Sequence, residues 1–289
     1  GEIDQFEPAM SLAAISRRRA GPVGMEMKLH FLPGIDHRTD DPGDVVCSPA
    51  EVDYLFGVMR QVMPDLALDV GQIVFTYAGV RPLPASDGVA GAISRDHSIR
   101  VFEAEGDRPF PVLSLVGGKW TTFRACGEEI ADGVLTRLGR SRLRTTSGVA
   151  VGGGAGWPKD VAAHVAAAAA RFRVPVARVA QLFERYGTGM TAILESFAGE
   201  VEIPLIHLPD HSRQEIAFLA RNERVVHLVD VVLRRTLVAL HGRATSDALA
   251  ELADVVGTAL GWPAERRAAE AKAASGFLVD NHAVQGRPR

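Results

Sequence analysis

Residues 112–124 read Val-Leu-Ser-Leu-Val-Gly-Gly-Lys-Trp-Thr-Thr-Phe-Arg, and this stretch decides the fold prediction for the first half of the chain. The apolar run Val112 to Val116 predicts a short strand. The hydroxyl residues after the glycine pair suit a helix start, and we expect this helix from about Thr121 to Leu138. Glycines let a ligand approach the backbone closely, and a helix start offers unpaired N–H groups with partial positive charge. The corner therefore suits an anion, although many strand–helix corners share its sequence pattern.

Two earlier segments carry arginines in a strand context. Residues 75–83 are Phe-Thr-Tyr-Ala-Gly-Val-Arg-Pro-Leu, in which the proline holds Arg81 extended. Such an arginine offers a planar fork to a phosphate or carboxylate, while a surface salt bridge is the more frequent arrangement at a strand end. In residues 93–99, a period of two places Arg95 and His97 on the same face as two isoleucines. If that face is buried, Arg95 needs a partner, and an anionic substrate and a structural carboxylate are equally good candidates.

The composition is that of an ordinary globular protein, with 289 residues, 47% hydrophobic and 23% charged. A net charge of −3 argues against a general nucleic-acid binder, which usually carries a basic face. Two cysteines are too few for a disulfide framework, which favours a reducing cytoplasm. No apolar run approaches the roughly 18 residues of a membrane span, and the acidic N-terminus does not fit an export signal. We expect a soluble or peripherally attached chain.

The N-terminal region is expected to be mixed in secondary structure. Met10 to Ile15 suits a short helix and Met25 to Leu32 a strand, followed by a turn-rich loop over Asp36 to Asp44. That loop contains metal-ligand residue types, but such runs are usually solvated. Ser48 fits the N-cap of a helix, with a proline next to it and Glu51 completing a capping box. Residues 72–116 then indicate strands.

Beyond residue 150 the chain is predicted to be almost entirely helical. Gly152 to Gly156 indicates a linker or loop, and it lacks the Lys-Ser/Thr of a phosphate loop. Asp230 and Arg234 are expected to pair at i,i+4, while His227 and His241 are expected to be structural. The helical segments are predicted at Val161–Phe172, Val176–Tyr186, Ser212–His241, Ala248–Leu260 and Ala264–Ala274. We therefore expect an α+β fold with a domain boundary between residues 1–145 and 146–289.

Taken in order, four motifs resemble the flavin-dependent glycerol-3-phosphate dehydrogenases. They are Ser-Pro-Ala-Glu-Val-Asp-Tyr-Leu at 48–55, Thr-Tyr-Ala-Gly-Val-Arg-Pro-Leu at 76–83, Ile-Ser-Arg-Asp-His at 93–97 and Gly-Gly-Lys-Trp-Thr-Thr-Phe-Arg at 117–124. The Leu-Arg-Arg-Thr at 233–236 is similar to that family's C-terminal helical domain. The resemblance covers roughly residues 34 to 275. Any one motif is weak, but the ordered set is specific.

The resemblance implies oxidation of sn-glycerol 3-phosphate to dihydroxyacetone phosphate by hydride transfer from C2 to N5 of FAD. It implies that Arg81 and Arg95 bind the substrate and that Lys119 is a catalytic residue between substrate and flavin. Cofactor-binding residues would be Gly117, Gly118, Lys119, Trp120 and Thr121. The fold implied is a mostly antiparallel substrate-binding sheet with a strand–helix unit at the flavin edge, followed by an all-α domain.

The chain also departs from the family pattern. It contains no Gly-x-Gly-x-x-Gly for a dinucleotide-binding unit and no Lys-Gly-Ser-His strand, whose histidine is a candidate base. We therefore expect the C-terminal portion of such an enzyme, supplying the substrate-site half. The alternative is a catalytically silent fragment that acts as a helical interaction or assembly module.

The resemblance further implies several partners. Electrons would pass to quinone or another acceptor, and a homodimer and peripheral contact with a membrane are both compatible with the family. The expected location is the cytoplasm, with the inner face of the cell membrane as a peripheral site. No nucleic-acid partner and no metal are expected.

Overall fold

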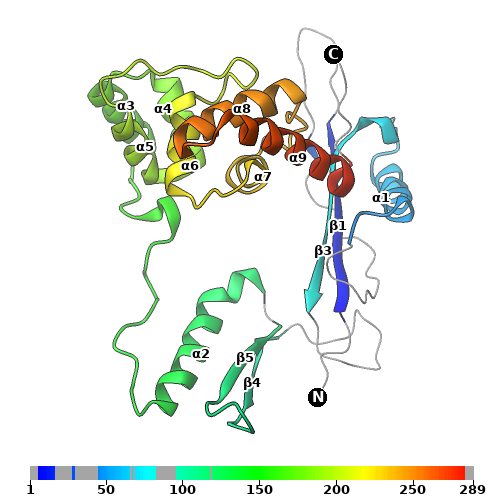
Figure 1. Ribbon diagram of the computed structural model, residues 1–289, viewed down its shortest axis with the longest axis vertical. Coiled ribbons are helices and arrows are strands. Elements are labelled where there is room, and N and C mark those ends of the chain that lie inside the picture. Colours follow the sequence, from blue (N-terminus) through cyan, green and yellow to red (C-terminus); the bar gives the residue numbers. More distant parts are fainter. Residues whose placement is uncertain are drawn as a thin grey trace. The chain divides into compact units, whose positions relative to one another are not determined.

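The computed structural model describes residues 6–16, 28–29, 45–65, 67, 69–82, 96–117 and 119–283 (Figure 1). The chain divides into two compact units. An N-terminal unit consists of Gly1–Ala13, His30–Gly71 and Thr76–Val149, and a helical unit consists of Ala14–Leu29, Gln72–Phe75 and Ala150–Arg289. The fold is α+β, as the sequence predicts.

The first strands form a three-stranded sheet in the order β2-β1-β3. Its strands are β1 (Phe6–Ser16), β2 (Lys28–Leu29) and β3 (Ile73–Pro82). The predicted helix at Met10 to Ile15 is therefore wrong. An isolated helix of six residues has little stability, whereas pairing with β2 and β3 provides hydrogen-bond partners for the backbone of this segment. β2 falls inside the predicted strand Met25 to Leu32, and the predicted loop over Asp36 to Asp44 lies outside the described residues.

Helix α1 (Pro49–Val62) begins as its sequence predicts. The hydroxyl of Ser48 accepts from the backbone N–H of Glu51 at 3.3 Å, and the Glu51 carboxylate accepts from the Ser48 N–H at 2.7 Å. This reciprocal capping satisfies N–H groups that a helix start leaves without partners. The helix buries one apolar stripe, which consists of Leu55, Phe56 and Met59.

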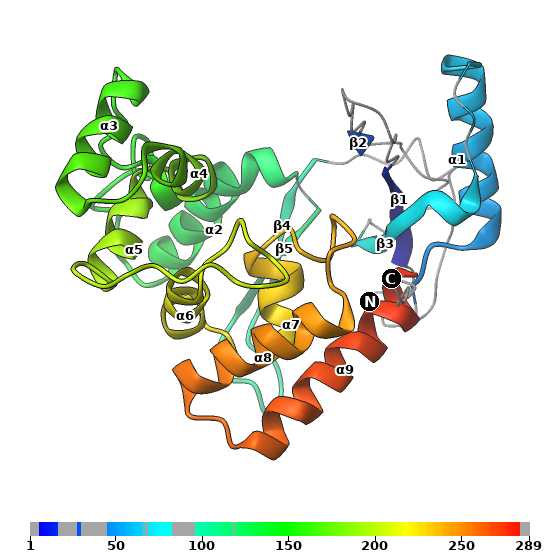
Figure 2. The same cartoon turned by 90° about the horizontal axis from the view of Figure 1, so that it is seen from above.

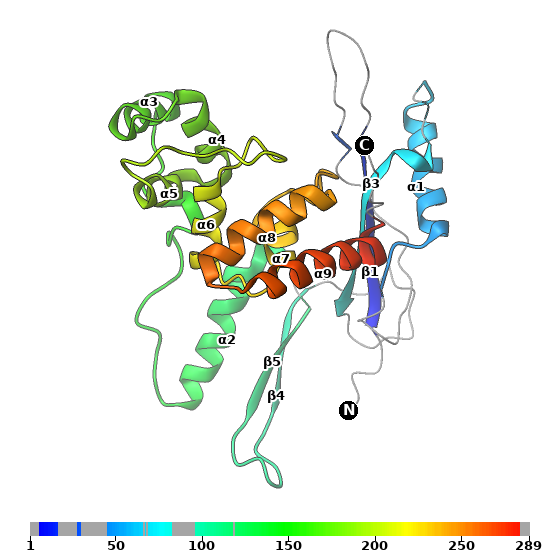
Figure 3. The same ribbon diagram turned by 45° about the horizontal axis from the view of Figure 1, so that its top comes forward.

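Strands β4 (Ser98–Phe102) and β5 (Val112–Val116) form an antiparallel hairpin that packs on α2 (Phe123–Arg137). The register pairs Ser98 with Val116 and Phe102 with Val112. Figure 3 shows the hairpin as a long ribbon beside the helix. The β5 strand and the α2 helix confirm the elements predicted from residues 112–124. Residues 93–95 of the period-two segment at 93–99 lie outside the described part of the chain.

The helical unit packs its helices around an apolar core. Helices α8 and α9 lie side by side (Figure 2), and α8 also packs on α6. The core is built largely from leucine, isoleucine, valine and alanine at helical spacing. Its helices are α3 (Val161–Phe172), α4 (Val176–Tyr186), α5 (Met190–Ser196), α6 (Arg213–Asn222), α7 (Leu228–Asp230), α8 (Ser246–Leu260) and α9 (Ala264–His282).

The predicted continuous stripe from Ser212 to His241 is broken in the structure. Helix α6 ends at Asn222, and Arg224 has a positive φ of 54° that no helix tolerates. Asp230 then accepts hydrogen bonds from the backbone N–H groups of Val226 and His227, which starts a new short helix. The predicted pair of Asp230 with Arg234 is confirmed at 2.6 Å. Apolar periodicity alone could not locate this break, because apolar residues continue at helical spacing on both sides of it.

The glycine run at 152–154, for which the sequence predicts a linker or a loop, is a closely packed turn. An added Cβ at Gly153 would lie 1.8 Å from the carbonyl oxygen of Tyr186, and one at Gly187 would lie 2.4 Å from the oxygen of Gly153. The hydroxyl of Thr188 lies 2.8 Å from the oxygen of Gly153 and 2.7 Å from that of Ala155, close enough to donate to either. The glycines are needed because two backbone segments cross in contact.

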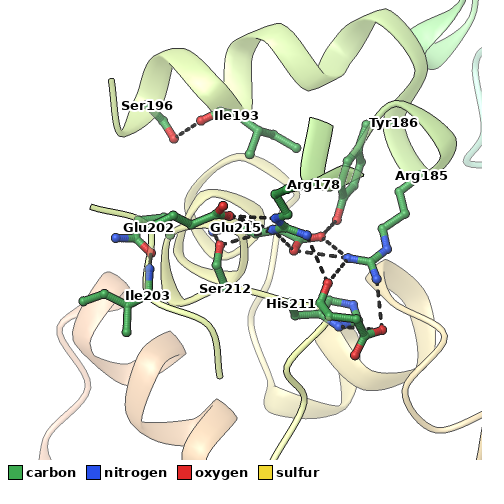
Figure 4. A network of polar contacts seen from close by, with 12 residues as sticks. Arg178, Arg185, Tyr186, Ile193, Ser196, Glu202, Ile203, His211, Ser212 and Glu215 are labelled. Atoms are coloured by element: carbon green, nitrogen blue, oxygen red, sulfur yellow. Dashed lines mark hydrogen bonds and ion pairs between the residues drawn. The ribbon is translucent and has the colours of Figure 1, made fainter. Parts of the chain in front are cut away.

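A buried ionic network joins α4 to α6 in the helical unit (Figure 4). The Glu215 carboxylate is fully buried and accepts from Arg178 at 2.8 Å, Arg185 at 3.0 Å and the Tyr186 hydroxyl at 2.6 Å. Arg178 also pairs with Glu202 at 2.7 Å. A buried carboxylate with this many donors is stabilised in its charged form.

Protonation follows from this arrangement. Burial opposes ionisation of Glu215, but the neighbouring His211, Arg178 and Tyr186 outweigh it, so the pKa of Glu215 is lowered. Burial and then the adjacent Glu215 charge raise the pKa of Tyr186 well above its ordinary value. Tyr186 therefore remains a donor, and Glu215 an acceptor, at neutral pH.

Substitution of Gly153 by alanine is expected to destabilise the helical unit by about 1–3 kcal/mol, the usual effect of overpacking. The backbone oxygen of Tyr186 leaves no room for the methyl group. Gly154→Ala is the matched control, because nothing lies within 4 Å of its added Cβ. Chemical denaturation measures both variants, and equal stability of the two would contradict the close contact.

Glu215→Gln is expected to lower the free energy of unfolding at pH 7 by about 3–5 kcal/mol, since it leaves buried arginines without their counter-charge. The lowered pKa means that the unfolded chain binds the proton first as pH falls below the ordinary value of 4.5. The contribution of the Glu215 charge to the free energy of unfolding should therefore be complete above that pH and decrease below it. In Glu215→Gln, the free energy of unfolding should not show this decrease.

Glu195→Gln is the matched control, because Glu195 forms an exposed pair with Arg171, and it should lower the free energy of unfolding by less than about 1 kcal/mol. An unchanged pH profile in Glu215→Gln would refute the assignment.

Candidate functional site

The turn between β5 and α2 is built on Gly117. Its φ is +76°, and an added Cβ would lie 2.9 Å from the carbonyl oxygen of Asp96. Only glycine adopts this conformation readily while allowing that backbone contact. The start of β4 therefore lies directly against the turn, and no bound ligand is needed to explain this glycine.

Thr122 closes the turn that follows Gly117. Its hydroxyl accepts from the backbone N–H of Lys119 at 3.2 Å and also lies 3.0 Å from the Lys119 carbonyl oxygen. The backbone N–H of Thr122 donates to the same oxygen at 3.0 Å. A 3-10 turn, Trp120–Thr122, leads into α2, and Lys119 is exposed at its start. Lys119 thus precedes the N-terminus, the positive end, of a 15-residue helix.

Two polar pairs connect the hairpin region to α2. Near the turn, Nε2 of His97 lies 2.5 Å from the Glu129 carboxylate, and because an ionised carboxylate only accepts, the imidazole donates. At the far end, Arg137 pairs with Glu103 at 3.0 Å. The helix is therefore held to the segment around β4 at its middle and at its C-terminal end.

The chain after α2 folds back onto the outer side of the helix. Glu128 accepts from the hydroxyls of Thr145 at 2.7 Å and Thr146 at 2.8 Å, accepts from the Thr146 N–H, and pairs with Arg142 at 2.5 Å. The backbone hydrogen bond of Thr146 is the largest of these effects, and together they lower the pKa of Glu128 to about 2. The carboxylate is charged at all physiological pH values and fixes this return of the chain.

The residues predicted for the site are described to different degrees. Arg81 lies on β3 within the N-terminal unit that also contains the turn, but its side chain is not described, and the same holds for Trp120. Arg95 and Gly118 lie outside the described residues. Gly117, Lys119 and Thr121 lie in the single turn, where Lys119 and Thr121 are exposed. Their predicted roles stay predictions.

Sequence reasoning missed Glu129. The period-two pattern places His97 on one face with Arg95. Nothing in that spacing identifies Glu129, 32 residues further along the chain, as the partner of His97. Glu129 lies seven residues after Thr122, which is two helical turns and the same face of α2. This helical spacing is the signal that would have suggested Glu129 as a residue below the turn.

The turn offers a donor set suited to an anion or to the electron-rich edge of a cofactor. It combines an exposed ammonium group, the N-terminus of α2 and a side-chain-free residue at Gly117. Among the described residues, no group of three or more histidine, cysteine or acidic side chains is placed to hold a metal ion. No described helix combines the length and apolar character needed to cross a membrane.

The helical unit also contains cavities. One of about 740 Å³ lies beside the glycine turn and Trp157, and another of about 530 Å³ lies beside Arg185, His211 and Arg243. The second opens onto the ionic network, in which the arginines are already paired with carboxylates: Arg243 lies 2.6 Å from Asp210. The second cavity is also lined by Arg235 and Thr236 of the Leu-Arg-Arg-Thr motif, whereas neither cavity is lined by Lys119 or Thr121.

Comparison with known proteins agrees with the motifs. Residues 144–267 match a family described as the C-terminal domain of alpha-glycerophosphate oxidase. A glycerol-3-phosphate dehydrogenase of Synechocystis sp. is 34% identical over 243 residues, which span 80% of this chain and 42% of the relative. The mitochondrial glycerol-3-phosphate dehydrogenase of Bos taurus is 27% identical over 281 residues, spanning 86% of this chain and 36% of that protein. The chain thus spans less than half the length of these curated relatives.

A solved structure shares the fold. The glycerol-3-phosphate dehydrogenase from Bacillus halodurans, complexed with FAD, superposes with a TM-score of 0.67 at 17% sequence identity. The match covers 99% of this chain and 58% of that one. At this identity the likeness establishes the fold and leaves the site to be argued from the residues themselves.

Gly117→Ala is expected to destabilise the N-terminal unit by about 2 kcal/mol or more, because the methyl group meets the Asp96 oxygen in a backbone conformation that alanine disfavours. Gly127→Ala, on α2 with nothing within 4 Å of its added Cβ, should be neutral or stabilise by up to about 1 kcal/mol. Thermal and chemical unfolding measure the difference. Tolerance of alanine at residue 117 would show that the turn does not depend on this contact.

Proposed function

We propose that this chain, which resembles the C-terminal portion of the FAD-dependent glycerol-3-phosphate dehydrogenases, supplies the substrate-binding half of such an enzyme. The reaction is oxidation of sn-glycerol 3-phosphate to dihydroxyacetone phosphate. The observation that carries the proposal is the turn at Gly117 to Thr122. It combines the Gly-Gly-Lys-Trp-Thr-Thr motif with an exposed Lys119 at the start of α2.

The substrate's phosphate carries two negative charges or nearly so at neutral pH, and arginine is the side chain that recognises it best. Arg81 and Arg95 are the proposed substrate-binding residues, which grip the phosphate or polarise the C2 hydroxyl. Proline at residue 82 restricts the backbone of Arg81, so part of the entropy of ordering this arginine is already lost before the substrate arrives.

FAD, when bound, accepts the hydride from C2 of the substrate, and it gains negative charge along its pyrimidine edge as it does so. The residues that fit this edge are Gly117, Gly118, Lys119, Trp120 and Thr121. Lys119 and the N-terminus of α2 both favour negative charge, and the backbone of Lys119 is held in place by Thr122. Lys119 is therefore proposed as the catalytic residue, which acts by its charge between substrate and flavin.

The C2 hydroxyl must lose its proton as the hydride leaves, so the proposed site also needs a base. Glu128 does not suit this role, because Thr145, Thr146 and Arg142 hold its carboxylate in the charged form. The Lys-Gly-Ser-His strand whose histidine is the family's candidate base does not occur in this sequence.

The remaining partners are proposals that follow from the family resemblance. Electrons would pass from the reduced flavin to a quinone or another acceptor. The proposed location is the cytoplasm or the inner face of the cell membrane, and a homodimer is compatible with the family. The competing function is a silent helical module, and a bound-flavin absorption band in the visible spectrum of the purified protein would eliminate it.

Arg81→Ala is expected to weaken binding of sn-glycerol 3-phosphate by about 2–4 kcal/mol, on the scale of a lost charged hydrogen bond. At about 1.4 kcal/mol per tenfold change, this is a loss of about 30- to 700-fold in affinity. Isothermal titration calorimetry of the chain with FAD present measures the effect. Arg100→Ala, at an exposed position on β4, is the matched control and should retain the wild-type affinity.

Two results would count against this role. Wild-type protein that binds neither glycerol 3-phosphate nor FAD contradicts the proposed function as a whole. Equal affinity of Arg81→Ala and wild type would remove Arg81 from the site while leaving the function in place.

A further inference from the structure

The pair formed by His97 and Glu129 lies directly beneath the Lys119 turn. His97 is three-quarters buried, and its Nε2 lies 2.5 Å from the carboxylate on α2. The next residue, Ser98, pairs with Val116 at the end of β5, and the preceding residue places its carbonyl oxygen against Gly117. His97 is thus the side chain that ties α2 to the point where β4 meets the turn.

Glu129 is connected to the turn along one face of α2. Thr122, Cys126 and Glu129 follow one another at helical spacing on this face. Cys126 is buried, and its Sγ lies 3.6 Å from the Thr122 hydroxyl. That hydroxyl in turn accepts from the backbone N–H of Lys119 at 3.2 Å. A shift of the helix at Glu129 therefore moves the group that holds Lys119.

From these contacts we infer that His97 and Glu129 are positioning residues, which fix the height and rotation of α2 and so the place of Lys119 in the proposed site. The inference rests on the proposed function, because Lys119 is the residue through which the pair acts. The pair itself touches neither substrate nor cofactor in this account.

The contact between His97 and Glu129 adds little to the stability of the fold as an ion pair. Glu129 is more than half exposed, and an exposed pair contributes little to stability. The pair of Glu103 with Arg137 connects the same hairpin region to the same helix, at the end remote from Lys119. Both pairs join a nitrogen donor to a partly exposed carboxylate across the same two elements, so the remote pair provides a structural control.

The experiment measures the affinity of the chain for sn-glycerol 3-phosphate by calorimetry with FAD present, together with stability by chemical denaturation. His97→Ala is expected to weaken binding by about tenfold or more, the usual effect of removing a residue that orients a site from behind. His97→Gln, which keeps an N–H donor for Glu129, should recover most of that loss. Arg137→Ala should leave the affinity unchanged while changing stability as much as His97→Ala does.

A double-mutant cycle tests whether His97 acts through Lys119. In a Lys119→Met background, His97→Ala should have little further effect on affinity, because the residue that it positions is gone. Full additivity of the two substitutions would overturn the inference, as would equal loss of affinity in His97→Ala and Arg137→Ala.

The proposed function and the positioning role of His97 can be refuted separately. Wild-type protein that does not bind glycerol 3-phosphate refutes the proposed function and the inference with it. Wild-type binding that is weakened by Lys119→Met but not by His97→Ala refutes the positioning role alone.

Discussion

The carbonyl oxygen of Asp96 occupies the space where a side chain at residue 117 would begin. This one contact makes glycine necessary at the end of β5, and it brings the start of β4 against the turn that leads into α2. The strand pairing of Ser98 with Val116 and the hydrogen bond from His97 to Glu129 both follow from that closeness. The position of Lys119 is therefore set by the backbone of a different strand, and not by the flexible lysine side chain itself.

The helical unit depends on a different constraint, the burial of a charged carboxylate. Its helices bury a fully desolvated carboxylate, Glu215, and such a group is tolerable only when several donors compensate for lost water. Arg178, Arg185 and Tyr186 supply these donors from a single helix, α4. The network therefore requires that α4 and α6 meet at one rotation and one height. The glycine crossing at Gly153 and Gly187 imposes a second fixed contact between backbone segments of the same unit.

Local signals in the sequence predicted the elements whose ends are determined locally. The Ser48–Glu51 capping box, the helices Val161–Phe172 and Val176–Tyr186, and the strand Val112–Val116 all appear as expected. Two of the failures share one cause, which is that a distant partner decides the structure, whereas the break between Ser212 and His241 is local, at Arg224 and the Asp230 cap. Strand pairing overrides helix at Met10 to Ile15, and a glycine run predicted as a linker or loop is fixed by contact with Tyr186. Likewise, motif order indicates the site around Lys119, while its support by Glu129 emerges only once α2 is packed on the hairpin.

If the turn at Lys119 and the end of β3 form the substrate side of a flavin site, sn-glycerol 3-phosphate should protect both segments from hydrogen–deuterium exchange in the presence of FAD. We expect slower exchange in residues 76–82 and 116–122, with the helices from residue 161 onward unchanged. Protection confined to the helical unit, or no protection anywhere in the chain, would show that the substrate does not bind at this turn.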